Sequence, residues 1–123
     1  MTYLDLYKAY SLELKFHMSD VIHVKSVEER SADHLSSTIK YWTKVKLHRL
    51  YVSKMDVFQY GYIDLVTGKI VPSIKDMSGD KLSKEDIDRN LTIVKKTWEN
   101  VLLFFITRLK EKTLHMQETL LSL

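Results

Sequence analysis

One long apolar repeat limits what this chain can fold into. The members of the repeat, which lie three or four positions apart, are Ile87, Leu91, Val94, Trp98, Val101, Phe105, Leu109, Thr113, Met116, Leu120 and Leu123. This spacing predicts an amphipathic helix from Lys84 to Leu121. Ser83 is its expected N-cap, and Glu85 and Asp86 suit the positive end of the helix dipole.

The predicted helix is longer than a domain of this size. At 1.5 Å per residue it would extend for about 57 Å. A compact domain of 123 residues measures roughly 35 Å across. Two outcomes are therefore open: the helix breaks between Thr107 and Thr113, or its far end docks on another chain. We expect the second outcome, with a homodimer formed through the C-terminal helix.

The sequence before this helix predicts three antiparallel strands. Residues 44–52 alternate with a period of two, and Val57–Val66 is rich in aromatic and β-branched residues. A Thr-Gly turn at residues 67–68 then leads into Lys69–Ile74. Pro72 cannot donate a hydrogen bond to a neighbouring strand, which favours an edge position for this third strand.

The N-terminal part of the chain predicts two helices. The first carries a stripe of residues three or four apart, which consists of Tyr3, Tyr7, Tyr10, Leu14 and Met18, and Thr2 is its expected N-cap. Ser26 and Glu29 have the spacing of a capping box and precede a second helical pattern. Between the two helices, residues 21–25 fit either a short strand or the end of the first helix.

These elements predict one α+β domain over residues 1–123. It would contain two N-terminal helices, a three-stranded antiparallel β-meander and a long C-terminal helix. We expect Phe58, Tyr60 and Tyr62, which share one face of a strand, to fill the core beneath a helix. Gln59 and Gly61 make the opposite face the weaker candidate. The alternative is that the aromatic face is exposed beside cations, where it could stack unpaired bases.

The positive charge of the chain is concentrated in one segment. The net charge is +3, yet no acidic residue occurs between Asp33 and Asp56. Five of the 19 basic residues lie there, so the rest of the chain holds 14 basic residues against 16 acidic ones. Such a segment attracts acidic partners, whether nucleic acid or protein. The simpler reading is a solvated face that keeps the protein in solution.

The sequence offers little support for catalysis or metal binding. It contains no Cys, and its five His residues form no His-x-His or His-x-x-x-His pair. Phosphate-binding glycine loops and nucleophile elbows are absent from it. Arg108 and His115 could in principle support a phosphate and move a proton, but two such residues seven apart often occur by chance. We therefore expect a protein that is not an enzyme and has no cofactor, metal or catalytic residue.

The leading functional hypothesis is a non-catalytic protein-binding regulator or inhibitor that occludes a partner's surface. Small immunity proteins and phage-encoded inhibitors of defence enzymes have this profile. The candidate partner-binding residues are Tyr3, Tyr7, Tyr10, Lys40, Lys44, Lys46, His48, Arg49 and Lys54. The three tyrosines are alternatively a half-buried core stripe. The second hypothesis is nucleic-acid binding through residues 34–55.

The sequence also predicts where the protein acts. The N-terminus lacks the basic region of a signal peptide and carries Asp5 among its apolar residues. The longest apolar run, residues 101–106, is far shorter than the ~20 residues that a bilayer span needs. We expect a cytoplasmic protein that does not bind membranes.

Overall fold

One antiparallel sheet and two helices make up the described part of the chain. The computed structural model describes residues 2–18, 21–28, 46–54 and 58–121. In chain order the elements are α1 (Tyr3–His17), β1 (Val21–Glu28), β2 (Lys46–Lys54), β3 (Phe58–Asp64), β4 (Ile70–Pro72) and α3 (Lys84–Leu121). The predicted α+β class is confirmed.

Helix α1 begins at a reciprocal capping box. The amide of Asp5 donates to Thr2 Oγ1 at 3.2 Å, and the amide of Thr2 donates to Asp5 Oδ2 at 3.0 Å. Each residue thus satisfies a backbone donor that the first helical turn leaves without a partner. The prediction of Thr2 as N-cap is confirmed. At the other end, the amide of Met18 donates to the carbonyl oxygen of Leu14 at 2.9 Å.

The prediction of two N-terminal helices is not matched. Residues 21–28 form β1, so Ser26 lies inside a strand and does not cap a helix. The β-branched residues of this segment favour the extended chain, and β1 pairs with β2 along its whole length. The remainder of the predicted second helix lies outside the described residues.

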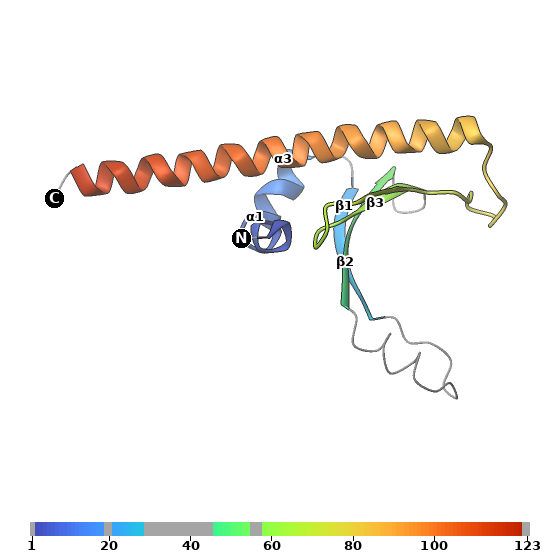
Figure 1. Ribbon diagram of the computed structural model, residues 1–123, viewed down its shortest axis with the longest axis horizontal. Helices are drawn as coiled ribbons and strands as arrows, with labels where there is room; N and C mark the ends of the chain where they lie inside the picture. The colour runs from blue at the N-terminus through green and yellow to red at the C-terminus, as the bar shows by residue number, and fades with distance from the viewer. Residues whose placement is uncertain (1, 19–20, 29–45, 55–57, 122–123) are drawn as a thin grey trace.

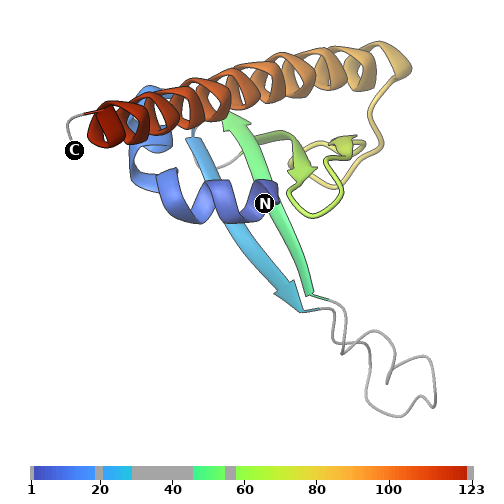
Figure 2. The same ribbon diagram turned by 60° about the vertical axis from the view of Figure 1, so that its left-hand side comes forward.

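The sheet has four strands in the order β1-β2-β3-β4, and all neighbours are antiparallel. Strands β2, β3 and β4 form the predicted meander, and β1 adds a fourth strand. Strand β4 is an edge strand, as the position of Pro72 predicted. The hairpin of β1 and β2 extends away from both helices, with Glu28 and Lys46 paired at its far end (Figure 2).

The turn between β3 and β4 is held by Asp64. Its Oδ1 accepts from the amides of Val66 at 2.8 Å and Thr67 at 3.3 Å. The amide of Gly68 donates to the Asp64 carbonyl oxygen at 2.7 Å, and Gly68 has a φ of 76°. Glycine adopts this conformation without steric cost, so the predicted Thr-Gly turn is confirmed.

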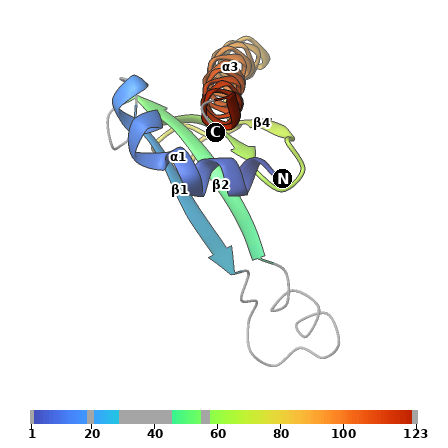
Figure 3. The ribbon, with the colours of Figure 1, turned by 90° about the vertical axis from the view of Figure 1, so that its left-hand side faces the viewer.

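Both helices pack on the same face of the sheet (Figures 1 and 3). The core beneath them contains fully buried residues from β2, from β3 and the residue after it, and from α3, which are Leu50, Val52, Ile63, Leu65, Val94, Val101 and Phe105. Leu6, Tyr7 and Leu14 close the same core from α1. Asn90 ties α3 to the sheet, since its Nδ2 donates to the carbonyl oxygen of Ser73 at 3.1 Å.

The expected placement of Tyr62 in the core is wrong. Ile63 and Leu65 face the core, so the alternation of the strand places Tyr62 on the opposite face. A register shift sets Val52 opposite Gly61 and Ser53 opposite Gln59, which leaves Tyr60 as an extra residue at a bulge. Tyr60 is half-buried at the edge of the core, and the side chain of Phe58 lies outside the described residues.

Helix α3 is continuous over 38 residues. It begins as predicted at Ser83, whose Oγ accepts from the amide of Asp86 at 3.2 Å. The predicted alternative of a break between Thr107 and Thr113 is not observed. The helix packs on the sheet with its first half and meets α1 near its middle, from Trp98 to Arg108, and beyond Arg108 it extends past α1 with no described element beneath it (Figure 1).

Candidate functional site

The three candidate tyrosines of α1 differ in exposure. Tyr7 is buried in the core. Tyr10 is half-buried with its ring edge-on to Phe104, at a centroid distance of 6.4 Å. Tyr3 is the most exposed of the three, and its ring lies edge-on to Trp98 at 4.9 Å. The stripe therefore packs mainly on α3, and Tyr3 alone offers substantial surface.

The basic candidates are only partly described. Lys40 and Lys44 lie outside the described residues. Lys46 and Lys54 are the first and last residues of β2, and the structure describes their backbone. His48 and Arg49 are half-buried within β2. Of the six basic candidates, the structure therefore describes the side chains of His48 and Arg49 only.

The second half of α3 carries an uncovered apolar surface. Met116 is 57% exposed and Leu120 is 68% exposed, although both continue the repeat that is buried from Val94 to Phe105. Leu109, between the two regions, is half-buried against the core. Shallow apolar hollows on this half are lined by Ile106, Leu109, Lys110, Thr113, Leu114 and Gln117. Large apolar side chains of this kind usually mark a contact surface when they lie together.

The outer face of the sheet, which is turned away from both helices, carries a second cluster. The Cζ atom of Arg49 lies 4.4 Å from the ring centroid of Tyr62. Tyr51 is the register partner of Tyr62, and their ring centroids are 5.7 Å apart. All three side chains are half-buried. The period of two in residues 44–52 places Arg49 and Tyr51 on one face of their strand, but the expectation that Tyr62 lies in the core does not predict the cluster.

A groove of about 650 Å³ lies between the end of α1 and α3. Its lining includes His17, Lys96, Asn100, Phe104 and Arg108. The ring of Phe104 forms its floor, with His17 at a centroid distance of 5.5 Å and the Arg108 guanidinium at 4.9 Å.

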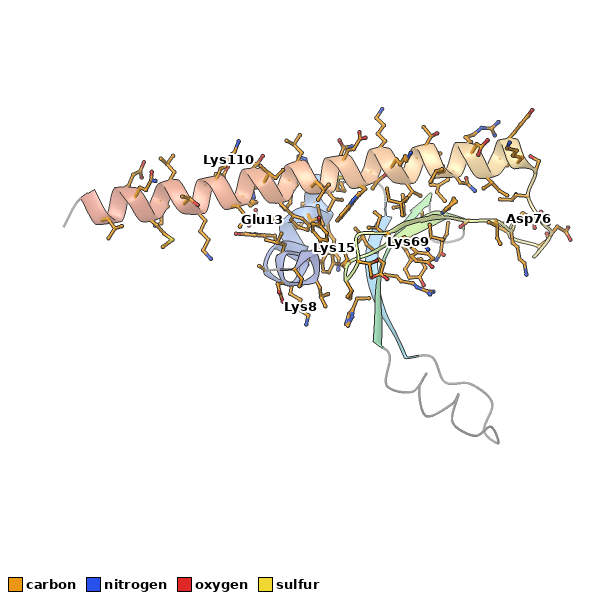
Figure 4. All side chains as sticks on the ribbon, viewed as in Figure 1. Lys8, Glu13, Lys15, Lys69, Asp76 and Lys110 are labelled. Atoms are coloured by element: carbon orange, nitrogen blue, oxygen red, sulfur yellow. The ribbon has the colours of Figure 1, made fainter. Side chains whose placement is uncertain are left out.

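Arg108 joins α1 to α3 at the edge of this groove. Its Nε lies 2.5 Å from Oε2 of Glu13, and its Nη1 donates to Oε2 of Glu111 at 2.9 Å. Burial opposes the charged form of the guanidinium, but the two carboxylates outweigh burial and raise the pKa of Arg108. Sequence patterns do not predict the contact with Glu13, because the two residues lie 95 positions apart. Figure 4 shows Glu13 on α1 and, on α3, Lys110 pointing away from α1.

Three further observations bear on function. Among the described residues, no three His, Asp or Glu side chains gather as a metal-binding group. Within the same part of the chain, no helix is both long and apolar enough to cross a bilayer. No family model, curated protein or solved structure matches this chain.

Proposed function

We propose that this protein is a non-catalytic protein-binding regulator, with the second half of α3 as its binding element. The observation that carries the proposal is the apolar repeat of α3, which is buried over the sheet and then continues uncovered to Leu120. On the sequence arguments given above, we further propose that the protein acts in the cytoplasm.

A partner would stabilise the uncovered end of the helix. It comprises about 15 residues, a length at which isolated helices are only marginally stable in water. Burying one large apolar side chain contributes about 1.5–3 kcal/mol relative to leaving it exposed. A partner that covers Met116 and Leu120 would therefore stabilise both the complex and the helix itself.

A second copy of the chain is the partner that the spacing favours. Ile106, Leu109, Thr113, Met116 and Leu120 follow one another at intervals of three, four, three and four. This is the seam of a coiled coil, in which each side chain of one helix enters a hole on an identical facing helix. The seam covers little more than two heptads, so we expect a dimer of moderate affinity. In a cell, a different protein with a helical apolar stripe could occupy the same surface and be regulated by it.

Light scattering across a concentration series tests the proposal. We expect a dimer at tens of micromolar. The double variant Met116→Glu, Leu120→Glu should be a folded monomer, since four carboxylates would meet in the dimer seam. The matched control is Thr107→Glu, His115→Glu, which adds the same two carboxylates to the opposite side of α3. This control should remain a dimer.

Two results would count against this assignment. A dimer that both double variants disrupt equally would show that net charge, and not the seam, controls association. A wild-type monomer at hundreds of micromolar would remove the second copy as the partner. The partner would then have to be a different protein, which the wild type and the control variant capture and the Met116→Glu, Leu120→Glu variant does not.

A further inference from the structure

Two adjacent rows of residues cross the outer face of the sheet. In the first row, strand register places Lys25 of β1 beside Arg49 of β2, and Arg49 beside Asp64 of β3. The amide of Asp64 then donates to the carbonyl oxygen of Lys69 at 2.9 Å, which extends this row to an exposed lysine. Three of its four residues are basic, so we call it the charged row.

The second row is largely aromatic. Register sets His23 beside Tyr51, Tyr51 beside Tyr62, and Tyr62 beside Val71 of β4. The two rows are two residues apart along each strand, which corresponds to about 6.6 Å. The Arg49 guanidinium, 4.4 Å from the ring of Tyr62, connects the charged row to the aromatic one.

We propose that this outer face binds single-stranded nucleic acid, with bases on the aromatic row and phosphates along the charged row. Tyrosine rings and arginine planes stack unpaired bases of any sequence, and basic side chains meet the backbone. The rings of Tyr51 and Tyr62 lie on neighbouring strands with centroids 5.7 Å apart and planes at 49° to each other. Because the Arg49 guanidinium lies over the ring of Tyr62, bases would stack on the guanidinium plane and on the ring of Tyr51. The inference does not rest on the proposed function, because both helices lie on the other face of the sheet (Figure 1).

The charges of the face agree with this ligand. The acidic residue of the charged row, Asp64, directs its Oδ1 to the amides of Val66 and Thr67 in the β3–β4 turn. Arg49 belongs to the acid-free segment between Asp33 and Asp56, which supplies the whole net positive charge. A polyanion is therefore attracted to the segment that contains Arg49, and the rings distinguish unpaired bases from other anions.

The test is fluorescence anisotropy with labelled probes of about ten nucleotides, the length that one small domain covers. The probes are oligo-uridine, oligo-deoxythymidine and a duplex DNA of the same length, all at low salt. We expect both single strands to bind, and the duplex to bind several-fold more weakly because its bases are not free to stack. Equal binding of single strands and duplex, or no binding at 100 µM protein, would overturn the inference.

Variants locate the site. Tyr62→Leu should weaken single-strand binding about tenfold or more, whereas Tyr62→Phe keeps the ring and should bind within about twofold of the wild type. Arg49→Met should weaken binding and lower the slope of log K against log salt by about 0.7. The matched control is Arg89→Met, which removes the same charge from α3, where Arg89 is exposed and paired with Asp86. This control should leave both quantities unchanged.

The fold of each variant is checked by circular dichroism and thermal unfolding. Should Tyr62→Leu fail to fold, Arg49→Lys carries the test, because it keeps the charge but loses the plane that stacks on a base. We expect Arg49→Lys to lose several-fold in affinity at an unchanged salt slope. Folded Tyr62→Leu or Arg49→Lys proteins that bind like the wild type would remove the site from this face.

Discussion

Val94 of α3 packs directly on the backbone of Gly61 in β3. A Cβ atom at Gly61 would lie 2.9 Å from Cγ2 of Val94 and 2.9 Å from Cα of Pro72, and still closer to the carbonyl oxygen of Val71. Gly61 also has a φ of 155°, which other residues rarely adopt. The absence of a side chain at this position lets the helix approach the sheet.

Gly61→Ala should therefore destabilise the protein by about 1–3 kcal/mol through overpacking, with backbone strain in addition. Gly79→Ala is the matched control, since Gly79 also has a positive φ of 85° but no atom within 4 Å of the added Cβ. Urea unfolding of both variants measures the difference. Equal losses of stability would show that only backbone conformation matters at Gly61.

Trp98 is 8% exposed and packs between Tyr3 and the core. Trp98→Ala should cost about 3–5 kcal/mol, the usual range for removing a buried aromatic side chain. This is a large part of the ~5–15 kcal/mol that stabilises a small domain. In a Trp42→Phe background, the fluorescence of Trp98 should have a blue-shifted maximum that moves to the red on unfolding. A maximum typical of water-exposed tryptophan in the folded protein would contradict this placement.

The capping box of α1 predicts a dependence of stability on pH. Hydrogen bonds from the amide and then the hydroxyl of Thr2 lower the pKa of Asp5 below its ordinary value of 3.8. Because the folded-state pKa is the lower one, the charged carboxylate stabilises α1 above pH 3.8 and this contribution is lost as the pH falls through the folded-state pKa.

Asp5→Asn should therefore lower the unfolding midpoint at neutral pH, and its difference from the wild type should shrink as the pH falls below 3.8. Thr2→Ala removes the other half of the box and should cost about 0.5–2 kcal/mol at neutral pH. Thermal unfolding followed by circular dichroism measures both. A difference between Asp5→Asn and the wild type that is independent of pH would argue against a charge effect.

Local signals explain which parts of the fold could be predicted from the sequence. Thr2 and Ser83 were identified as N-caps because a cap depends on residues within one helical turn, and the Thr-Gly turn at residues 67–68 is equally local. Residues 21–25 are ambiguous by sequence between a strand and a helix end, because a short β-branched segment becomes a strand only when β2 pairs with it. The expectation that Tyr62 lies in the core is wrong, because the number of aromatic residues on one strand face does not reveal that α3 packs against Gly61 on the other face.

The candidate surfaces likewise combine features that sequence spacing predicts with contacts that only the tertiary structure reveals. The length of the apolar repeat correctly indicated that α3 outgrows its domain, although the choice between a break and a projecting end required the structure. The pairing of Arg49 with Tyr62, and of Arg108 with Glu13, depends on tertiary contacts that no sequence spacing encodes.

The ion pair of Arg108 and Glu13 predicts a measurable coupling between the two helices. The two side chains are 30% and 53% exposed, so solvent screens the pair and the coupling should be small. A double-mutant cycle with Arg108→Gln and Glu13→Gln measures it, and high salt should reduce it. The cycle with Glu111→Gln is the comparison, since that pair lies within α3. Coupling for Glu111 alone would show that Arg108 does not hold α1.

The last prediction concerns the acid-free basic segment. Lys46 begins β2 three residues before Arg49, and this odd spacing assigns the two positions to opposite faces of the sheet. If a strand bound on the outer face also passes around the end of the hairpin to the basic segment, the double variant Lys44→Glu, Lys46→Glu should weaken single-strand binding and lower its salt slope by about 0.7 for each phosphate contact that is lost. If it instead steers an acidic protein, the change should lie mostly in the association rate. The proposed dimerisation through α3 should not change, because Lys46 is the first residue of β2 and the hairpin of β1 and β2 extends away from the helices (Figure 2). A folded variant with unaltered binding to nucleic acid and to protein partners would leave the segment as a solvated face.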